Sequence, residues 1–457
     1  MEREAAERDN YRGTLDYLFG LQKFGIKLGL DNITVLLKQL GNPHAGFRAI
    51  HIAGTNGKGS TAAFLASILR QAGYRVGLYT SPHLVDFTER IQVDGVPITE
   101  KRVVQLTEQI RRVVDQMIRE GSLWAKGTAT LLPKDFDPGK ATITFFEFTT
   151  AMAFLHFQEA RVEVAVLETG LGGRLDATNV IDPLLSLITS ISLEHQQYLG
   201  KTLLQIAGEK AGIIKPGRPL LTTARQPEVR SLLEQKCRKL QSPFYVWGRD
   251  FRSRRVGPQL MNFRGRYHRW LKLRLGLGGR HQILNASLAL AAAEVLIEGG
   301  FSLDEEHLRK GLAETKWPGR LEMIGDSPRI LLDGAHNPGA AEVLKKSLKG
   351  NFSRRRLILV LGIMADKEIP KMMTHLVPLA DLLILTRPRM DRAASPALLR
   401  SHASSFGKPM VEVAEVSAAV KYALAEAEKE DLIVISGSLF TVGEARAFLV
   451  EQGMIPA

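Results

Sequence analysis

The chain has 457 residues, of which 45% are hydrophobic and 24% charged, and its formal net charge is +13. This length predicts two domains of an ordinary globular protein. One cysteine excludes an internal disulfide and favours a reducing compartment, no signal peptide is visible, and the longest mainly apolar run, 286–297, is too short to cross a membrane. We therefore expect a cytoplasmic protein with no membrane partner.

The positive charge raises the question of nucleic acid, because basic patches supply most non-specific affinity for phosphate backbones. Here the basic residues are mostly dispersed, with short clusters at 252–255 and 354–356. Only residues 263–270 interleave arginines with aromatic rings, and that stretch is short enough to be one half-exposed strand. We expect no nucleic-acid partner, and a surface that attracts anionic small substrates or keeps the protein soluble.

Residues 54–61 read Gly-Thr-Asn-Gly-Lys-Gly-Ser-Thr between a predicted buried strand, 47–53, and a predicted helix, 62–72. The glycines let backbone N–H groups turn inward, and the helix points its positive end at the same spot. Lys58 supplies a cation for the β- and γ-phosphates, and the hydroxyls of Ser60 and Thr61 suit Mg²⁺. An extra glycine before Ser60 departs from G-x-x-x-x-G-K-[ST]. The stretch predicts a nucleotide phosphate site; the alternative is a glycine-rich turn with a chance lysine.

Several polar residues follow predicted elements along the chain. Residues 11–40 are predicted helical, and strand 76–79 delivers Ser81 to the sheet edge where ligands bind, although a serine before proline is equally turn chemistry. A helix is predicted at 99–119, a mobile inserted loop at 121–140, and an aromatic-rich helix at 144–157 whose rings are core or stack a flat heterocycle.

The next strand, 162–167, ends at Glu168, where a carboxylate is expected to face a metal or nucleotide; the alternative is a capped turn with a solvated glutamate. Strand 184–190 leads to His195, either a metal ligand or a turn histidine. Lys210 ends a predicted helix at 202–211, where a lysine usually reaches solvent.

In the second half of the chain, a new series of alternating strands and helices is predicted. Strands and one helix fill 220–275, helices follow at 281–296 and 303–314, and after residues 317–320 strands at 330–332, 357–361, 382–385 and 432–435 alternate with helices. We predict an α/β fold with an N-terminal P-loop ATPase-type domain on a mostly parallel sheet (1–315), a linker (316–322), and a smaller C-terminal Rossmann-like α/β domain (323–457). The cleft between them is a usual home for small ligands.

Together with the phosphate loop, six motifs occur in family order, at 80–84, 89–91, 168–179, 209–213, 332–338 and 437–439. They resemble folylpolyglutamate synthase and its bifunctional form with dihydrofolate synthase activity, within the Mur ligase superfamily, over residues 14–448. Glu194 stands where the family more often has Asp, and Phe440 where Tyr is common. The 121–140 insertion also varies in the family.

The resemblance implies an ATP-dependent ligase that adds L-glutamate to dihydropteroate or to the glutamate tail of reduced folates through an acyl phosphate, releasing ADP and phosphate. It implies two Mg²⁺ ions, a monomer, and a C-terminal domain that closes over the site and binds glutamate. The catalytic residues it implies are Lys58, Lys210, His195 and Glu168, with Lys210 matching a carbamylated lysine.

The same resemblance implies the binding residues. The nucleotide contacts are Asn56, Gly57, Lys58, Gly59, Ser60, Asn285 (adenine), Arg320, Asp333 and His336, the last also a candidate for glutamate. The metal ligands are Ser81 and Glu168, with Ser60 as a further candidate, and His195 with Glu168 for the second ion. The pteroyl group is expected against Ser81, Pro82, His83, Thr144, Phe146, Asp176 and Ala177.

Two other classes of function stay open. A Mur-type peptidoglycan-precursor amide ligase usually carries a separate N-terminal substrate domain, whereas here only about 50 residues precede the phosphate loop. A non-catalytic nucleotide-binding protein or nucleic-acid motor would need a basic groove or an arginine finger, for which the sequence shows no signal.

Overall fold

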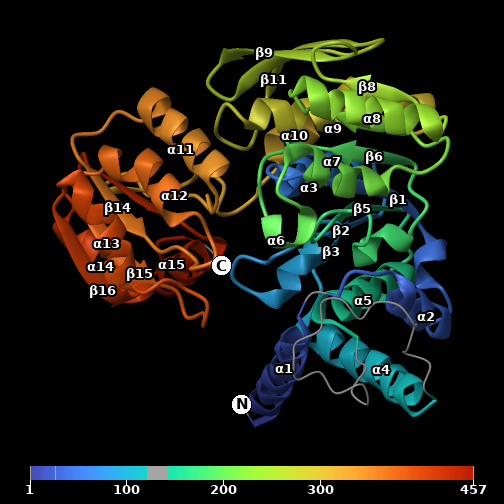
Figure 1. The fold of residues 1–457 in the computed structure, drawn as a ribbon, viewed down its shortest axis with the longest axis horizontal. Helices are drawn as coiled ribbons and strands as arrows, with labels where there is room; N and C mark the ends of the chain where they lie inside the picture. The colour runs from blue at the N-terminus through green and yellow to red at the C-terminus, as the bar shows by residue number, and fades with distance from the viewer. Residues whose placement is uncertain (1, 26, 121–142, 456–457) are drawn as a thin grey trace.

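The computed structural model describes residues 2–25, 27–120 and 143–455, built on two large sheets (Figure 1). The predicted loop at 121–140 lies outside these residues. The first sheet has the order β4-β3-β2-β5-β1-β6-β7-β8 and the second β12-β13-β17-β14-β15-β16. We call the part on the second sheet (residues 322–455) the C-terminal lobe and the part before it the N-terminal lobe.

The N-terminal sheet runs parallel from β2 to β8, with β3 and β4 antiparallel at one edge. Its central strands are short, almost uninterrupted apolar runs, as expected for a sheet buried on both faces. The strands are β1 (Arg48–Ala53), β2 (Val76–Tyr79), β3 (Ile91–Val93), β4 (Val96–Pro97), β5 (Val164–Glu168), β6 (Leu185–Ile188), β7 (Leu220–Thr222) and β8 (Phe244–Val246).

Helices cover both faces of this sheet (Figure 1). One face carries α1 (Glu2–Gly20), α2 (Asp31–Gln39), α4 (Glu100–Arg119) and α5 (Phe145–Glu159); the other carries α3 (Lys58–Gln71), α9 (Gln282–Glu298) and α10 (Glu305–Glu314). Towards β6 and β7 lie α6 (Gln196–Leu199), α7 (Leu203–Lys210) and α8 (Pro227–Lys239). None of the described helices is long and apolar enough to cross a membrane.

A small antiparallel sheet lies beyond α9, formed by β9 (Arg252–Gly257), β10 (Leu260–Arg264) and β11 (Arg269–Arg274) (Figure 1). The expectation of one strand over 263–270 is wrong, because the chain turns between Phe263 and Trp270. These two residues pair across β10 and β11, and their rings stack with centroids 5.4 Å apart. Both are buried against the core, so neither ring is available to stack on a base.

The C-terminal lobe is a second parallel sheet with one antiparallel edge strand. Its strands are β12 (Glu322–Ile324), β13 (Arg329–Leu332), β14 (Leu357–Leu361), β15 (Leu382–Arg387), β16 (Met410–Glu415) and β17 (Leu432–Ser436). The helices are α11 (Pro338–Asn351), α12 (Ile369–Leu376) and α13 (Pro396–Ala403) on one face, and α14 (Val416–Glu426) and α15 (Leu439–Glu451) on the other. The sequence missed β12 and β16, because these partly exposed edge strands carry no apolar run.

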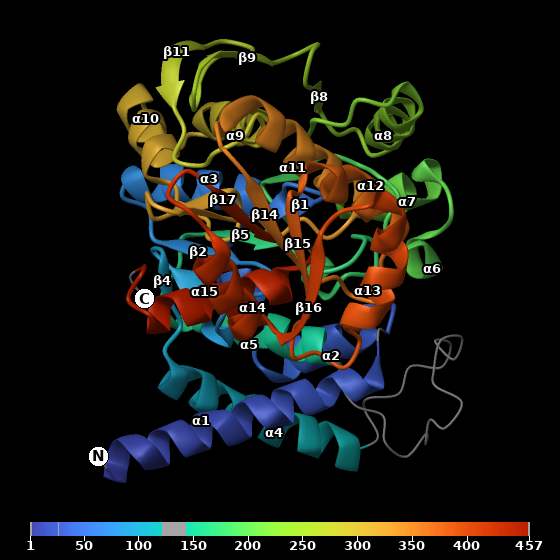
Figure 2. The same ribbon diagram turned by 90° about the vertical axis from the view of Figure 1, so that its left-hand side faces the viewer.

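The two lobes meet where α15 packs on the loop that follows β2, and Figure 2 shows the C-terminal lobe in front of the N-terminal one. Gly443 of α15 makes the closest approach, since a Cβ built there would lie 1.9 Å from the carbonyl oxygen of Leu84. Only glycine therefore allows α15 to reach this loop.

The Gly443→Ala variant should be destabilised by about 1–3 kcal/mol, because a methyl group at this position forces backbone apart. Gly208→Ala is the matched control: Gly208 also lies within a helix, but no atom stands within 4 Å of its built Cβ. That variant should gain about 0.5–1 kcal/mol from helix propensity. Urea unfolding of both proteins measures the difference, and equal stabilities would contradict the close approach.

Candidate active site

The phosphate loop connects the carboxyl end of β1 to α3, and Gly57 is the N-cap residue of that helix with φ 94°. A Cβ on Gly57 would lie 2.4 Å from Oδ1 of Asn285, so this position admits only glycine. Asn285 Nδ2 donates to Gln282 Oε1 (2.8 Å), and Gln282 Nε2 donates to Ser60 Oγ (3.3 Å). The start of α9 thus lies directly against the loop, with Asn285 and Ser60 in one polar cluster.

Two lysines converge on the loop. Lys58 Nζ donates to the carbonyl oxygens of Gly54 (3.0 Å) and Thr55 (3.3 Å). Lys210 Nζ donates to the same Gly54 oxygen at 2.9 Å and to Glu194 Oε1 at 2.7 Å. Lys210 is almost fully buried, so the end-of-helix lysine does not point to solvent. Two ammonium groups on one carbonyl oxygen make this point strongly attractive to an anion.

Glu168 is the carboxylate facing these cations. Its Oε1 lies 3.8 Å from Lys58 Nζ, and its Oε2 accepts a hydrogen bond from the backbone N–H of Ser81 at 3.4 Å. Burial raises the pKa of Glu168, and Lys58 and Arg320 oppose that rise. The alternative of a solvated turn glutamate is wrong, because Glu168 is buried at the junction of β5, the phosphate loop and the loop after β2.

Burial and charge also set the protonation of Lys210 and its partner. Burial lowers the pKa of Lys210, with Glu194 opposing the change. Burial alone would raise the pKa of Glu194, but Lys210 and Lys58 outweigh it and hold that pKa below its usual range. In the present structure, the contact between Lys210 and Glu194 is therefore that of an ammonium group with an ionised carboxylate.

The residues predicted to bind metal fit an ion that arrives with a nucleotide. In the described part of the chain, no three or more histidine, cysteine or acidic side chains gather as a metal centre of their own. Magnesium at nucleotide sites usually needs only one or two carboxylates besides phosphate and water, a role open to Glu168 with the hydroxyls of Ser81 and Ser60. Burial lowers the pKa of His195 to about 4, so this imidazole is neutral near pH 7 and its lone pair is free to ligate.

The linker and the C-terminal lobe together present three predicted nucleotide contacts around one turn. Asp333 accepts hydrogen bonds from the backbone N–H groups of Leu321 and Ala335, each at 3.1 Å. Arg320 donates to the carbonyl oxygen of Gly334 at 3.4 Å, and His336 Nδ1 donates to the same oxygen at 2.8 Å. This bond leaves His336 Nε2 as the acceptor, and burial lowers the pKa of His336 to about 4.

Asn337 was not predicted from the sequence. Its Nδ2 donates to Asn56 Oδ1 (3.0 Å), and Asn56 Nδ2 donates back to Asn337 Oδ1 (3.4 Å). The same Oδ1 accepts from the backbone N–H of Ala340 and so caps α11 (2.8 Å). An asparagine before proline signals a helix N-cap, but no local pattern could identify a partner 281 residues away. This amide pair joins the phosphate loop to the C-terminal lobe.

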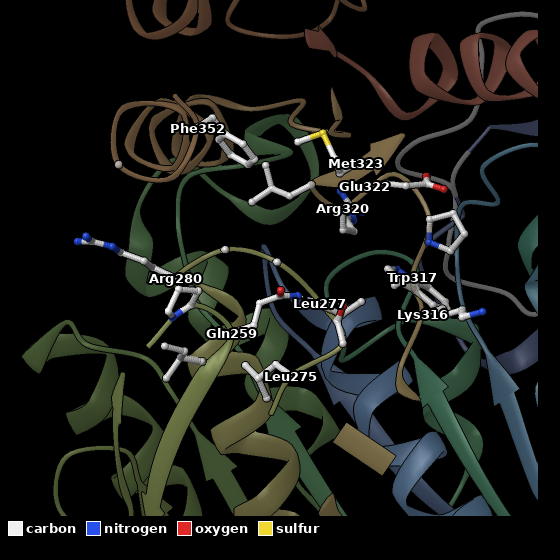
Figure 3. Close-up of a pocket in the computed structure, with 18 of the residues that line it drawn as sticks. Gln259, Leu275, Leu277, Arg280, Lys316, Trp317, Arg320, Glu322, Met323 and Phe352 are labelled. Atoms are coloured by element: carbon white, nitrogen blue, oxygen red, sulfur yellow. Dashed lines mark hydrogen bonds between the residues drawn. The ribbon is translucent and has the colours of Figure 1, made fainter. Parts of the chain in front are cut away.

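A cavity of about 1140 Å³ opens between the lobes (Figure 3). Its walls come from the loop before α9, the linker, and the C-terminal lobe, and include Leu277, Arg280, Trp317, Arg320, Met323 and Phe352. The indole of Trp317, which the sequence did not single out, lies 3.1 Å from the place a Cβ of Gly59 would take. The cavity therefore begins beside the phosphate loop and can accommodate a nucleoside.

The residues predicted to bind the pteroyl group lie mainly at the ends of β2 and β5. The ring of Phe146 packs on Gly170, and Tyr79 lies beside it with ring centroids 6.0 Å apart. Asp176 accepts from the backbone N–H of Leu171 at 2.8 Å, which shapes the loop after β5.

The remaining predicted pteroyl contacts have local partners. Thr144 Oγ1 donates to Glu147 Oε2 (2.7 Å) and is occupied in capping α5. His83 Nδ1 accepts from Arg90 Nε at 2.8 Å. Ala177 is buried at the start of the short turn η6 (Ala177–Val180), and Pro82 follows Ser81 through a cis peptide bond.

Asp333 should make stability depend on pH. Burial raises its pKa to about 6, against the lowering effect of Arg320. The folded state thus holds this proton more tightly than the unfolded chain, so the group's contribution to stability is lost as pH rises from about 4 to 6. The free energy of unfolding of Asp333→Asn, measured with urea relative to wild type, should therefore rise by about 2–3 kcal/mol from pH 4 to pH 7.

Asp431→Asn is the control for this measurement. Burial alone would raise the pKa of Asp431, but the backbone N–H of Glu428 and the side chains of Arg356 and Arg355 lower it overall. The difference in free energy of unfolding between Asp431→Asn and wild type should therefore stay nearly constant between pH 4 and pH 7. A flat difference for Asp333→Asn as well would show that Asp333 ionises normally.

Comparison with known proteins agrees with the motifs and the geometry. The Mur ligase middle domain matches residues 106–293, and the Mur ligase glutamate ligase domain matches residues 319–439. The dihydrofolate synthase/folylpolyglutamate synthase of Bacillus subtilis is 35% identical over 445 residues, covering 95% of this chain and 98% of that protein.

Two solved structures extend the match to the fold. The folylpolyglutamate synthase of Thermotoga maritima superposes with a TM-score of 0.82 at 37% identity, covering 97% of this chain and 98% of that one. Escherichia coli FolC, solved in complex with DHPP and ADP, gives a TM-score of 0.83 at 30% identity, covering 96% and 98%. The predicted mostly parallel α/β fold is thereby confirmed, and the chain belongs to the dihydrofolate synthase/folylpolyglutamate synthase family of Mur ligases.

Proposed function

We propose that this protein is an ATP-dependent amide ligase that joins L-glutamate to the carboxylate of dihydropteroate, of reduced folates, or of both. One observation carries the proposal: Lys58 and Lys210 converge on the Gly54 carbonyl oxygen, with Glu168 facing Lys58 at the same sheet edge. Bringing a carboxylate to a triphosphate sets like charges against each other, and the ammonium group of Lys58 offsets that repulsion whether or not Lys210 is carbamylated. A peptidoglycan-precursor ligase and a non-catalytic nucleotide-binding protein are set aside by the family assignment.

The reaction proceeds in two displacements. An oxygen of the acceptor carboxylate attacks the γ-phosphorus of ATP, the bond to the β-phosphate oxygen breaks, and ADP leaves with an acyl phosphate formed. The amine of L-glutamate then attacks the acyl carbon, phosphate leaves with the bonding electrons, and the amine loses a proton as the amide forms. Lys58 neutralises the transferring phosphoryl group, and the N-terminus of α3 holds its oxygens.

The nucleotide is expected to lie across both lobes. Its phosphates occupy the loop of Asn56, Gly57, Lys58, Gly59 and Ser60, and its adenosine enters the cavity bordered by Trp317 and Arg320. Asn285 is the proposed adenine contact, and Asp333 accepts from the nucleotide's hydroxyl groups. Mg²⁺ would be held by Glu168 with Ser81 and Ser60, and by His195 with Glu168; when bound, it supplies charge neutralisation and alignment of the phosphates.

The C-terminal lobe is proposed to bind L-glutamate beside His336, whose Nε2 is left as a proton acceptor by its bond to Gly334. Pro82, His83, Thr144, Phe146, Asp176 and Ala177 form the proposed pteroyl site at the opposite side of the phosphate loop. Because both lobes of one chain supply every proposed contact, we propose a monomer. The buried thiol of Cys237 fits a reducing compartment such as the cytoplasm.

Carbamylation of Lys210 is a further part of the proposal. Adding CO₂ requires a neutral amine, which burial favours by lowering the pKa of Lys210. The carbamate is anionic, however, and both present partners of Lys210, Glu194 Oε1 and Gly54 O, are acceptors. Carbamylation therefore requires Glu194 to turn away, so that the new carboxylate-like group meets a cation instead.

The overall reaction is tested by coupling. With ATP and Mg²⁺, the purified protein should release one ADP for each amide formed from dihydropteroate or a tetrahydrofolate, and only when L-glutamate is present. Mass spectrometry of the acceptor measures the added glutamyl residue. Two outcomes would rule out the proposed reaction. One is ADP release that occurs only when the acceptor is a muramyl peptide, and the other is ADP release with no amide formed on any acceptor.

Lys210 variants separate a carbamate from an ammonium. Lys210→Ala should lower kcat by roughly 100-fold, and formate or acetate with bicarbonate should restore part of it by replacing the missing carboxylate-like group. Lys210→Glu should retain more activity than Lys210→Ala. Lys215→Ala, which removes another partly buried lysine that donates to Asn179 O, should not respond to formate. No rescue, together with an inactive but folded Lys210→Glu protein, would argue for a plain ammonium.

A further inference from the structure

Arg90 is a buried arginine that the reaction above does not use. It ends the short turn η3 (Phe87–Arg90), and only 6% of the residue is exposed. Its Cζ lies 5.1 Å from the ring centre of Phe145 and 5.9 Å from that of Phe87. Its carbonyl oxygen accepts from the N–H of Thr80 at 3.0 Å, which fixes it to the end of β2, next to Ser81. The guanidinium is therefore enclosed by aromatic rings at the edge of the active site.

No carboxylate in the described part of the chain forms an ion pair with Arg90. The two acids nearest in sequence are already occupied. The carboxylate of Glu89 accepts from the backbone N–H groups of Leu84, Val85 and Asp86, at 2.7, 2.9 and 2.9 Å. Asp86 accepts from Thr88 and from the hydroxyl of Tyr11. Glu89 and Glu168 act on Arg90 at a distance, without an ion-pair contact. A buried cation is usually paired by direct contact, and the guanidinium of Arg90 has no such contact with an acid.

The one hydrogen bond of the guanidinium orients it. Arg90 Nε donates to His83 Nδ1 at 2.8 Å, so Nδ1 is the acceptor and the ring proton sits on Nε2. With Nε occupied, the two terminal amino groups remain for a second partner, and their planar fork matches a carboxylate.

We propose that Arg90 is a substrate-binding residue whose two terminal amino groups hold a carboxylate of the pteroyl acceptor, with His83 fixing the direction of the fork. The half-buried rings of Phe145, which lies against the guanidinium, and of Phe146, which packs on buried Tyr79, offer flat apolar surface to the aromatic part of the same ligand. This inference rests on the proposed function and assigns the recognition of the acceptor's charge to one side chain. The carboxylate is either the one that reacts or the α-carboxylate of a glutamyl tail.

The test measures affinity without turnover. Isothermal titration calorimetry, with a non-hydrolysable ATP analogue and no L-glutamate, compares dihydropteroate with its carboxamide, and tetrahydrofolate with its α-carboxamide. The proteins are wild type, Arg90→Met, Arg90→Lys, and the matched control Arg48→Met. Arg48 also stacks on a ring, with Cζ 4.4 Å from the ring centre of Phe301, but it lies at the opposite end of β1 from the phosphate loop.

Wild type and Arg48→Met should bind one carboxylate form roughly 10- to 100-fold more tightly than its carboxamide, the range of a charge-assisted hydrogen-bonded pair. In Arg90→Met this ratio should fall to about 1, and in Arg90→Lys to an intermediate value, because a point charge replaces the fork. The pair of ligands whose ratio collapses identifies the carboxylate: dihydropteroate for the reacting group, tetrahydrofolate for the α-carboxylate.

Two results would overturn the inference. One is a carboxylate preference in Arg90→Met or Arg90→Lys equal to that of wild type with both pairs. The other is a wild-type protein that binds carboxylates and carboxamides equally, a result that needs no folded variant. If no pteroyl compound binds wild type at all, the proposed function fails first, and the role of Arg90 fails with it.

Discussion

Concentrated positive charge at one backbone carbonyl is the constraint on which the rest of the site depends. Two ammonium groups share the Gly54 oxygen, and inside a protein such a pair repels strongly unless anions surround it. Glu194 and Glu168 supply part of that balance within the chain. The remainder is available to a bound polyanion, which explains why a lysine at a helix end is buried here instead of reaching water.

The parallel sheet is what brings these groups together. β1, β2 and β5 are neighbours, so their carboxyl ends deliver the phosphate loop, Ser81 and Glu168 to one edge although more than 80 residues separate the last two. The linker then adds Arg320, which lines the interlobe cavity, and the C-terminal lobe adds Asp333. The short loop after β2 has two roles. It carries the proposed pteroyl contacts, and it packs against α15 at Gly443.

Much of this arrangement could be predicted from the sequence, because it rests on short-range patterns. Apolar runs that end in Gly54, Ser81, Glu168 and Asp333 indicate both the strands and the edge to which their ends point. What failed were features set by distant neighbours. The turn between Phe263 and Trp270 depends on burial against α9, and the edge strands β12 and β16 exist only through pairing. Likewise, nothing local in the sequence indicates that Trp317 covers Gly59 or that Arg90 lacks an acidic partner.

The reciprocal amide pair between Asn56 and Asn337 makes the two lobes energetically inseparable at the point of chemistry. A ligand that stabilises the C-terminal lobe in this position also stabilises the present conformation of the phosphate loop. Thermodynamic linkage then requires that a ligand of the phosphate loop stabilise this position of the C-terminal lobe by the same free energy. An amino acid bound to the C-terminal lobe and a nucleotide bound at the phosphate loop would therefore strengthen each other's binding through this pair. Two amide hydrogen bonds limit that mutual gain to about 1–3 kcal/mol, or roughly a 5- to 150-fold difference in nucleotide affinity measured with and without the amino acid.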